Sequence, residues 1–233
     1  MQSHNNSTIR YCLHVILTVC WLGIISLLQR GIDFKKDAFH TVKQFDYMPS
    51  APFLKVAAME YKEVTADFIW LQAVQLIAKS RVGEYTGAHN LDWFYKTMDL
   101  VTDLDPLFSS AYQVGGVVLS VLSDDVDSSN ILLNKGMRYN PTDWHLPFYL
   151  GFNYMYHLQD NLKAAQYMEK ASQIEGHPVY LPLLTARLYT NGKDPQTALL
   201  FLKGVYLTTQ DEKMREKLGE RISELEKELD SKK

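Results

Sequence analysis

Scattered histidines and a short acidic run are the residues of this 233-residue chain whose types could support catalysis or metal binding. No two histidines stand four residues apart around the Glu that a helical zinc protease requires: His40, His89, His145, His157 and His177. Asp124, Asp125 and Asp127 could attract a cation, but they lack the Gly and the distal Glu of a calcium loop, which favours a solvated turn. A glycine-rich phosphate loop and a serine nucleophile elbow are lacking as well. We therefore expect a protein that is not an enzyme and that needs no metal or cofactor.

Composition narrows the class of partner. The net charge is −3, and the charged residues are distributed without long runs of one sign. The charge distribution therefore gives no indication of binding to nucleic acid. Cys12 and Cys20 lie inside an apolar N-terminal run, and the rest of the chain has no cysteine. A disulfide framework or a thiolate zinc site is thus excluded there.

A recurrence of about 35 residues organises the chain between residues 91 and 205. Helical patterns end at Asp105-Pro106, at Asn140-Pro141 and near Gly176-His177-Pro178. Each unit begins with a helix that has a small residue in its middle, followed by a second helix with a small–large–small triplet. The small residues are Gly116, Gly151 and Ala186, and the triplets are Ser129/Leu133/Gly136, Ala164/Met168/Ala171 and Ala198/Leu202/Val205. Helix pairs recurring at this period predict an all-α stack of hairpins, a solenoid.

The small residues have a physical purpose in such a stack. They let neighbouring helices approach to ~8–10 Å, and large residues fill the adjoining holes. The predicted packing residues are Gly116, Gly151, Tyr154, Ala164, Met168, Ala171, Ala186, Ala198 and Leu202.

These residues resemble the tetratricopeptide repeat (TPR) family. The first helix of the family pattern has Leu-Gly and then Tyr, which Leu150-Gly151 and Tyr154 match. The second helix has Ala, an aromatic residue four later and Ala three later; Ala164, Met168 and Ala171 match it, with Met in the aromatic position. Tyr112, Gly115-Gly116 and Leu119 match another first helix, and Ala186 and Tyr189 the last. The turn after the first helix is one residue longer than the family pattern in two units, near Asp124–Asp127 and near Gln159–Asn161. The resemblance implies a right-handed solenoid of helical hairpins over residues 53–209.

The resemblance also implies a concave face lined by the first helices. Carried onto this sequence, it gives a partner-binding groove with an aromatic centre and a polar rim. The residues are Gln113, Val117, His145, Phe148, Phe152, Met155, Tyr156, Tyr180, Leu183, Arg187 and Asn191. The alternative, left open here, is that Phe148 and Phe152 belong to the core or are covered by the preceding linker.

An apolar run near the N-terminus predicts a membrane anchor. Residues 11–28 contain no Asp, Glu, Lys or Arg, and this length is near the lower end of the ~17–25 residues of a spanning helix. A cleaved signal peptide is the rival, but no small-x-small site follows the run. Lys and Arg beside the run favour a cytoplasmic soluble domain, whereas the short N-terminal tail and the cysteine-free domain favour the extracytoplasmic side, which we expect.

The remaining segments complete the predicted organisation. Residues 1–10 form a tail, and residues 29–52 form a juxtamembrane linker that could contact the first repeat through Phe34, Phe39, Phe45 and Tyr47. A single long helix is predicted from Phe53 to Lys79, with Val64, Phe68, Leu71 and Gln75 on one stripe and a further apolar face. Residues 210–233 predict a capping helix with Met214, Leu218, Ile222, Leu225 and Leu229 on its inner side. Self-association through this helix is a second interpretation.

The sequence thus predicts a single-pass membrane scaffold or adaptor that binds protein partners through its repeat surface and assembles or stabilises a membrane-associated or envelope complex. Two alternatives are a permanent structural subunit of a membrane complex and a secreted TPR-like binding protein with a cleaved N-terminal signal.

Overall fold

The computed structural model describes residue 14 and residues 17–19, 21–26, 50–79 and 92–231, and the chain divides into two units, Met1–Met48 and Pro49–Lys233. In the first unit, the described residues, His14, 17–19 and 21–26, are helical. No helix among the described residues combines the length and the apolar character needed to cross a membrane. Much of the predicted anchor and the linker up to residue 49 lie outside the described residues.

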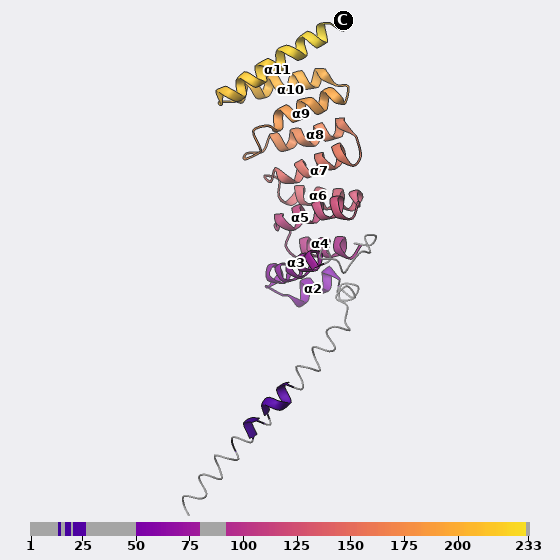
Figure 1. Cartoon of the computed structure of the whole chain (residues 1–233), viewed down its shortest axis with the longest axis vertical. Coiled ribbons are helices and arrows are strands. Elements are labelled where there is room, and N and C mark those ends of the chain that lie inside the picture. The colour runs from indigo at the N-terminus through magenta and orange to yellow at the C-terminus, as the bar shows by residue number, and fades with distance from the viewer. Residues whose placement is uncertain (1–13, 15–16, 20, 27–49, 80–91, 232–233) are drawn as a thin grey trace, which may run out of the picture. The chain divides into compact units, whose positions relative to one another are not determined.

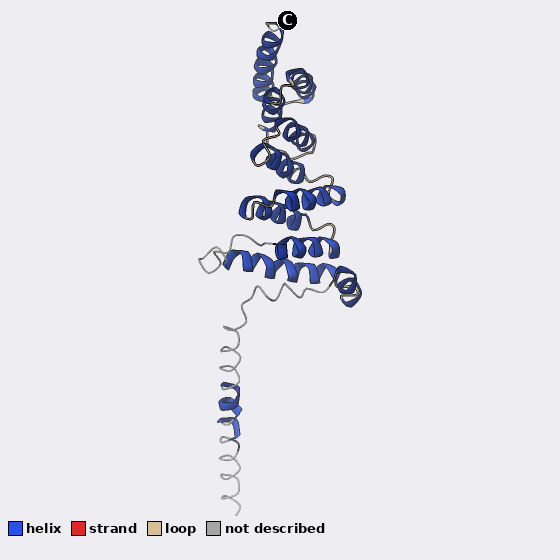
Figure 2. Ribbon diagram, turned by 90° about the vertical axis from the view of Figure 1, so that its right-hand side faces the viewer, coloured by secondary structure: helices blue, strands red, loops and turns tan. Residues whose placement is uncertain are grey.

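The second unit is built from helices, and the described residues contain no strand, which confirms the all-α prediction. The elements are α2 (Ala51–Ala57), α3 (Lys62–Lys79), α4 (Asp92–Leu104), α5 (Ser109–Val117), the π-helix η3 (Val118–Leu122), α6 (Val126–Tyr139), α7 (His145–Tyr156), α8 (Asn161–Ser172), α9 (Leu181–Asn191), α10 (Pro195–Thr208) and α11 (Glu212–Asp230). From α3 onward each helix contacts the next one in the chain, and α5 also contacts α7 (Figures 1 and 2). This is a helical-repeat-like arrangement, in which most contacts join neighbours in sequence.

The first part of this unit departs from the predicted single helix. Residues 53–79 form α2 and α3 with a break between them, where Met59 adopts a left-handed backbone with φ 49°. Ser50 precedes α2 without a side-chain capping bond, and Pro52 lies in the first turn. The sequence has no Gly or Pro at this break. The apolar pattern therefore predicted one continuous helix where the structure has two.

Three hairpin turns repeat the same geometry. The residue before each second helix is an Asp whose carboxylate accepts a backbone N–H: Asp125 from Ser128 at 3.0 Å, Asp160 from Lys163 at 3.0 Å, and Asp194 from Thr197 at 3.1 Å. Each Asp follows a residue with positive φ: Asp124 at 56°, Gln159 at 54° and Lys193 at 65°. Each Asp N–H also donates, at 2.9 Å, to a first-helix carbonyl: Leu119, Tyr154 and Tyr189. These acceptors recur every 35 residues, so the period seen in the sequence is a period of the structure.

The extra residue predicted in two of these turns lies in a widened last turn of the first helix. At the end of α5 the chain widens into the π-helix η3. After α7 the N–H of Leu158 donates to the carbonyl of Asn153, five residues earlier, at 3.1 Å. In the third hairpin the N–H of Gly192 makes an ordinary α-helical bond to Leu188. A wider last turn therefore absorbs one residue without disturbing the capped helix that follows.

Close packing between paired helices repeats at the same spacing. A Cβ added at Gly116 would lie 2.6 Å from Leu133, and one added at Gly151 would lie 2.9 Å from Met168. Both distances are too short for carbon atoms, so a side chain at either glycine would force Leu133 or Met168 to shift. The other predicted packing residues are fully buried except Tyr154, which is half-buried and stacks on Tyr167 at 5.4 Å: Ala164, Met168, Ala171, Ala186, Ala198 and Leu202.

The last helix covers the C-terminal end of the described stack. Met214, Leu218 and Leu225 are buried on α11, which packs on α10. Its outward positions are charged, and Arg221 pairs there with Glu224 at 2.8 Å. The apolar stripe predicted for residues 210–233 is therefore directed at α10.

Candidate protein-binding surface

The predicted groove residues all lie on or beside the first helices of the three hairpins. Gln113 and Val117 are on α5, the residues from His145 to Tyr156 are on α7, Leu183, Arg187 and Asn191 are on α9, and Tyr180 precedes α9. Tyr156, Tyr180, Arg187 and Asn191 are exposed; Gln113, Val117, His145, Phe148, Phe152, Met155 and Leu183 are half-buried.

The aromatic centre is shared between the core and the surface. Phe148, Phe152, Met155 and Leu183 pack against the buried cluster of α8 to α11. The ring of Phe152 also stacks on that of Tyr156, with centroids 5.6 Å apart, and Tyr156 is 64% exposed. These side chains therefore support the core and are also partly exposed beside Tyr156, and whether they bind a partner stays a prediction.

A polar cluster around Asp143 joins the first two hairpins. Its carboxylate accepts hydrogen bonds from the Gln113 amide at 2.7 Å, the Ser109 hydroxyl and the His145 backbone N–H at 3.0 Å. Burial by itself raises the pKa of Asp143, but the hydrogen bonds from Ser109, His145 and Gln113 outweigh it and lower the net pKa. The carboxylate is therefore ionised at neutral pH. The Gln113 amide, predicted to face a partner, is engaged in this cluster.

The acidic turn weighed as a cation site performs a structural role. Asp125 caps α6, and the Asp124 carboxylate lies 3.6 Å from Nδ1 of His157. Nε2 of His157 is buried without a hydrogen-bond partner. In the part of the chain that the structure describes, no group of three or more His, Cys, Asp or Glu side chains could hold a metal ion.

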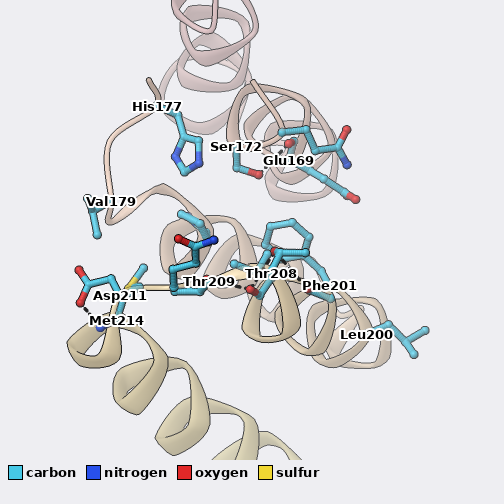
Figure 3. A pocket seen from close by; sticks show the side chains of 15 residues that line it. Glu169, Ser172, His177, Val179, Leu200, Phe201, Thr208, Thr209, Asp211 and Met214 are labelled. Carbon is cyan, nitrogen blue, oxygen red and sulfur yellow. Dashed lines mark hydrogen bonds between the residues drawn. The ribbon is translucent and has the colours of Figure 1, made fainter. Parts of the chain in front are cut away.

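Near the C-terminal end, the structure contains a groove of about 750 Å³ that sequence reasoning missed (Figure 3). It lies between the end of α8, the connection to α9, the second half of α10 and the start of α11. Phe201, Val205 and Met214 give it apolar walls, and it is also lined by Glu169, Ser172, His177, Thr208, Thr209 and Asp211. Asp211 accepts the N–H of Lys213 at 2.9 Å and so caps α11.

A buried tyrosine, Tyr189, holds Glu169, one of the residues that line this groove. The Tyr189 hydroxyl donates to the Glu169 carboxylate. Burial is the main cause that raises the pKa of Tyr189, and the Glu169 carboxylate raises it further. The hydroxyl therefore stays protonated. One sequence signal could have indicated the groove. Residues 199–207 read LLFLKGVYL, and these apolar residues occupy more of the helix circumference than a single buried face needs. Leu200 and Leu207 are indeed largely exposed.

A smaller apolar pocket of about 360 Å³ includes one predicted contact residue. Val117 lines it together with side chains of α3, α4 and η3. The full lining is Val74, Ile77, Ala78, Phe94, Val114, Val117, Val118, Val121 and Leu122. Val117 thus faces a hollow between the first helices of the unit.

In comparisons with known proteins, the chain matches no family model, no curated protein and no solved structure.

Proposed function

We propose that this chain is a non-catalytic, membrane-anchored scaffold of the TPR type, which binds protein partners through its helical-repeat surface to hold together a membrane-associated complex. The observation that supports it best is the hairpin turn repeated at Asp125, Asp160 and Asp194. Stacked hairpins of this kind present extended surfaces with little chemistry of their own, and they act by docking.

The docking face that we propose consists of Tyr156, Tyr180, Arg187 and Asn191 with the outer edges of Phe148 and Phe152. Tyrosine and arginine are the side chains that most often dominate binding energy in protein interfaces. Tyr156 and Tyr180 are each more than half exposed, so their rings are available to a partner without unfolding of the hairpins. A partner helix or peptide with apolar anchors fits this composition.

Photo-crosslinking tests the docking face. Probes replace Tyr156, Tyr180 and Arg187 in the full chain, and a matched control replaces Tyr139, an exposed tyrosine on α6. We expect the three first-helix probes to trap the same protein and the Tyr139 probe to trap little of it. Capture at Tyr139 or on α11 alone, with nothing at the first helices, would refute the proposed face.

The anchor is a separate part of the proposal and rests on the apolar run of residues 11–28. We expect the full-length mass in the membrane fraction and resistance to alkaline extraction. A mature chain that lacks its first ~30 residues contradicts the anchor and favours a cleaved signal.

For the repeat domain we propose an extracytoplasmic position. With Cys12 and Cys20 replaced by Ser, a cysteine at the exposed Asn191 should react with an impermeant maleimide in intact cells. Labelling only after lysis would place the domain in the cytoplasm.

A further inference from the structure

Helix α3 carries an apolar stripe that is exposed to solvent. Val64 is 62% exposed, Phe68 61% and Leu71 48%, and Tyr61, just before the helix, is 71% exposed. The opposite side of α3 contains the buried residues Ala66, Ala73, Leu76 and Ile77, and α3 packs on α4. The helix is therefore apolar on two sides, one packed on α4 and the other exposed, with no described residue covering it.

The spacing of the exposed stripe is that of a helix–helix contact. Apolar or uncharged residues alternate at intervals of three and four: Tyr61, Val64, Phe68, Leu71, Gln75 and Ala78. This is the a/d pattern of a two-stranded coiled coil, narrower than the face of a helix that covers a globular core. A straight helix matches it more closely than a lipid surface does, since a membrane-surface helix is rich in basic residues beside its apolar face, whereas α3 balances Lys62 and Lys79 with Glu63 and Asp67.

The charges beside the stripe favour a second copy in a parallel orientation. At 100° per residue, Asp67 lies on one flank of the stripe, and Thr65 and Gln72 lie on the other. In a parallel, in-register pair each flank meets the opposite flank of the other chain, which brings Asp67 near the partner's Gln72. An antiparallel pair centred on Phe68 would bring the two Asp67 carboxylates together, which is unfavourable.

The polar residue within the stripe agrees with this pairing. Gln75 occupies an a position, where a polar side chain fixes register at some cost in stability. In an in-register pair the two Gln75 amides lie opposite each other, and each can donate to and accept from the other.

The size of the exposed stripe fits a small helix–helix interface. A Phe or Tyr presents about 150–250 Å² when fully exposed, and Tyr61 and Phe68 are more than half exposed. With Val64 and Leu71, the exposed apolar area of the stripe is on the order of a few hundred Å². A patch of that size is often an interaction site, and together with its polar flanks it corresponds to a small interface, below the ~800 Å² per partner of a standard one.

We propose that two copies of this chain associate through parallel, in-register pairing of α3. In this pair, the second copy covers the exposed side of α3. The contact lies apart from the docking face on α7 and α9, so it does not depend on the proposed function.

Disulfide trapping in the full chain, with Cys12 and Cys20 replaced by Ser, tests the pairing. Val64→Cys and Leu71→Cys place a thiol in the stripe, and Glu63→Cys places one on the exposed flank as the control. Mild oxidation in cells should link each stripe variant to its own copy and leave Glu63→Cys mainly unlinked. Differently tagged Val64→Cys and Leu71→Cys chains should not link to each other. An antiparallel pair centred near Phe68 would link them.

A charge in the stripe supplies the second measurement. Phe68→Glu should abolish the disulfide of Val64→Cys and convert the native mass of the full chain from dimer to monomer. Phe68 is exposed, so an unchanged circular dichroism spectrum should accompany this loss. Three results would overturn the proposal. The stripe cysteine could remain unlinked and react freely with maleimide, or it could be shielded by residues 29–48 of a monomeric chain. It could also form its disulfide with a different protein.

Discussion

At the scale of single residues, the contacts between hairpins include buried polar side chains that hydrogen-bond to one another. Asn153 is buried and donates to Ser129 and Asn130, both at 2.9 Å, and Ser129 donates to the Gly116 carbonyl at 2.8 Å. This chain of bonds runs from α7 through α6 to α5. A buried polar network of this kind specifies the register in which two hairpins stack, because each group left unpaired costs about 1–3 kcal/mol.

The Asp143 cluster leads to a prediction about pH. A carboxyl whose pKa is lower in the folded chain contributes stability above its unfolded pKa of about 3.9. That contribution is lost as pH falls through the folded pKa. Denaturant unfolding at a series of pH values should therefore show that Asp143→Asn loses stability at neutral pH, and that the gap to the native chain narrows in acid. A gap that stays constant from neutral pH to about pH 2 would contradict this account.

The glycine contacts lead to a prediction about packing. Gly116→Leu and Gly151→Leu each place a side chain where Leu133 or Met168 already lies, and overpacking should cost about 1–3 kcal/mol or more. Gly204 in α10 is the matched control, because a Cβ there meets nothing within 4 Å. Gly204→Ala should instead stabilise the chain by about 0.5–1 kcal/mol. Thermal or denaturant unfolding measures both, and equal effects at the three glycines would exclude the close-contact explanation.

At the scale of elements, the same capped turn starts α6, α8 and α10, and this equivalence can be measured. Asp125→Ala, Asp160→Ala and Asp194→Ala should each reduce the free energy of unfolding by about 1 kcal/mol, the usual cost of a lost N-cap. Replacement by Asn should restore most of that loss, because an amide oxygen also accepts the N–H. A loss confined to one of the three sites would show that the turns are not energetically equivalent.

At the scale of the whole repeat unit, stability should be distributed along the stack, because most contacts join consecutive helices. Removal of residues 210–233 exposes the side of α10 that Leu218 and Leu225 cover. Hydrogen exchange should then become faster in α9 and α10, while α5 to α8 keep most of their protection. Uniform loss of protection in all helices would show a single cooperative unit instead.

The sequence by itself determined that the second unit is all-helical, where its hairpins turn and which small residues lie at their contacts. These features depend on local signals, namely X-Pro boundaries, small residues at fixed positions and a 35-residue recurrence, all of which lie within single units. Only the tertiary structure decided which apolar faces are covered. Phe148 and Phe152 rest partly on the core, α3 leaves Phe68 and its neighbours exposed, and a groove opens beside α10. Apolar spacing shows that a face requires cover, but the neighbour that provides it lies a whole helix or more away in the chain or belongs to another molecule.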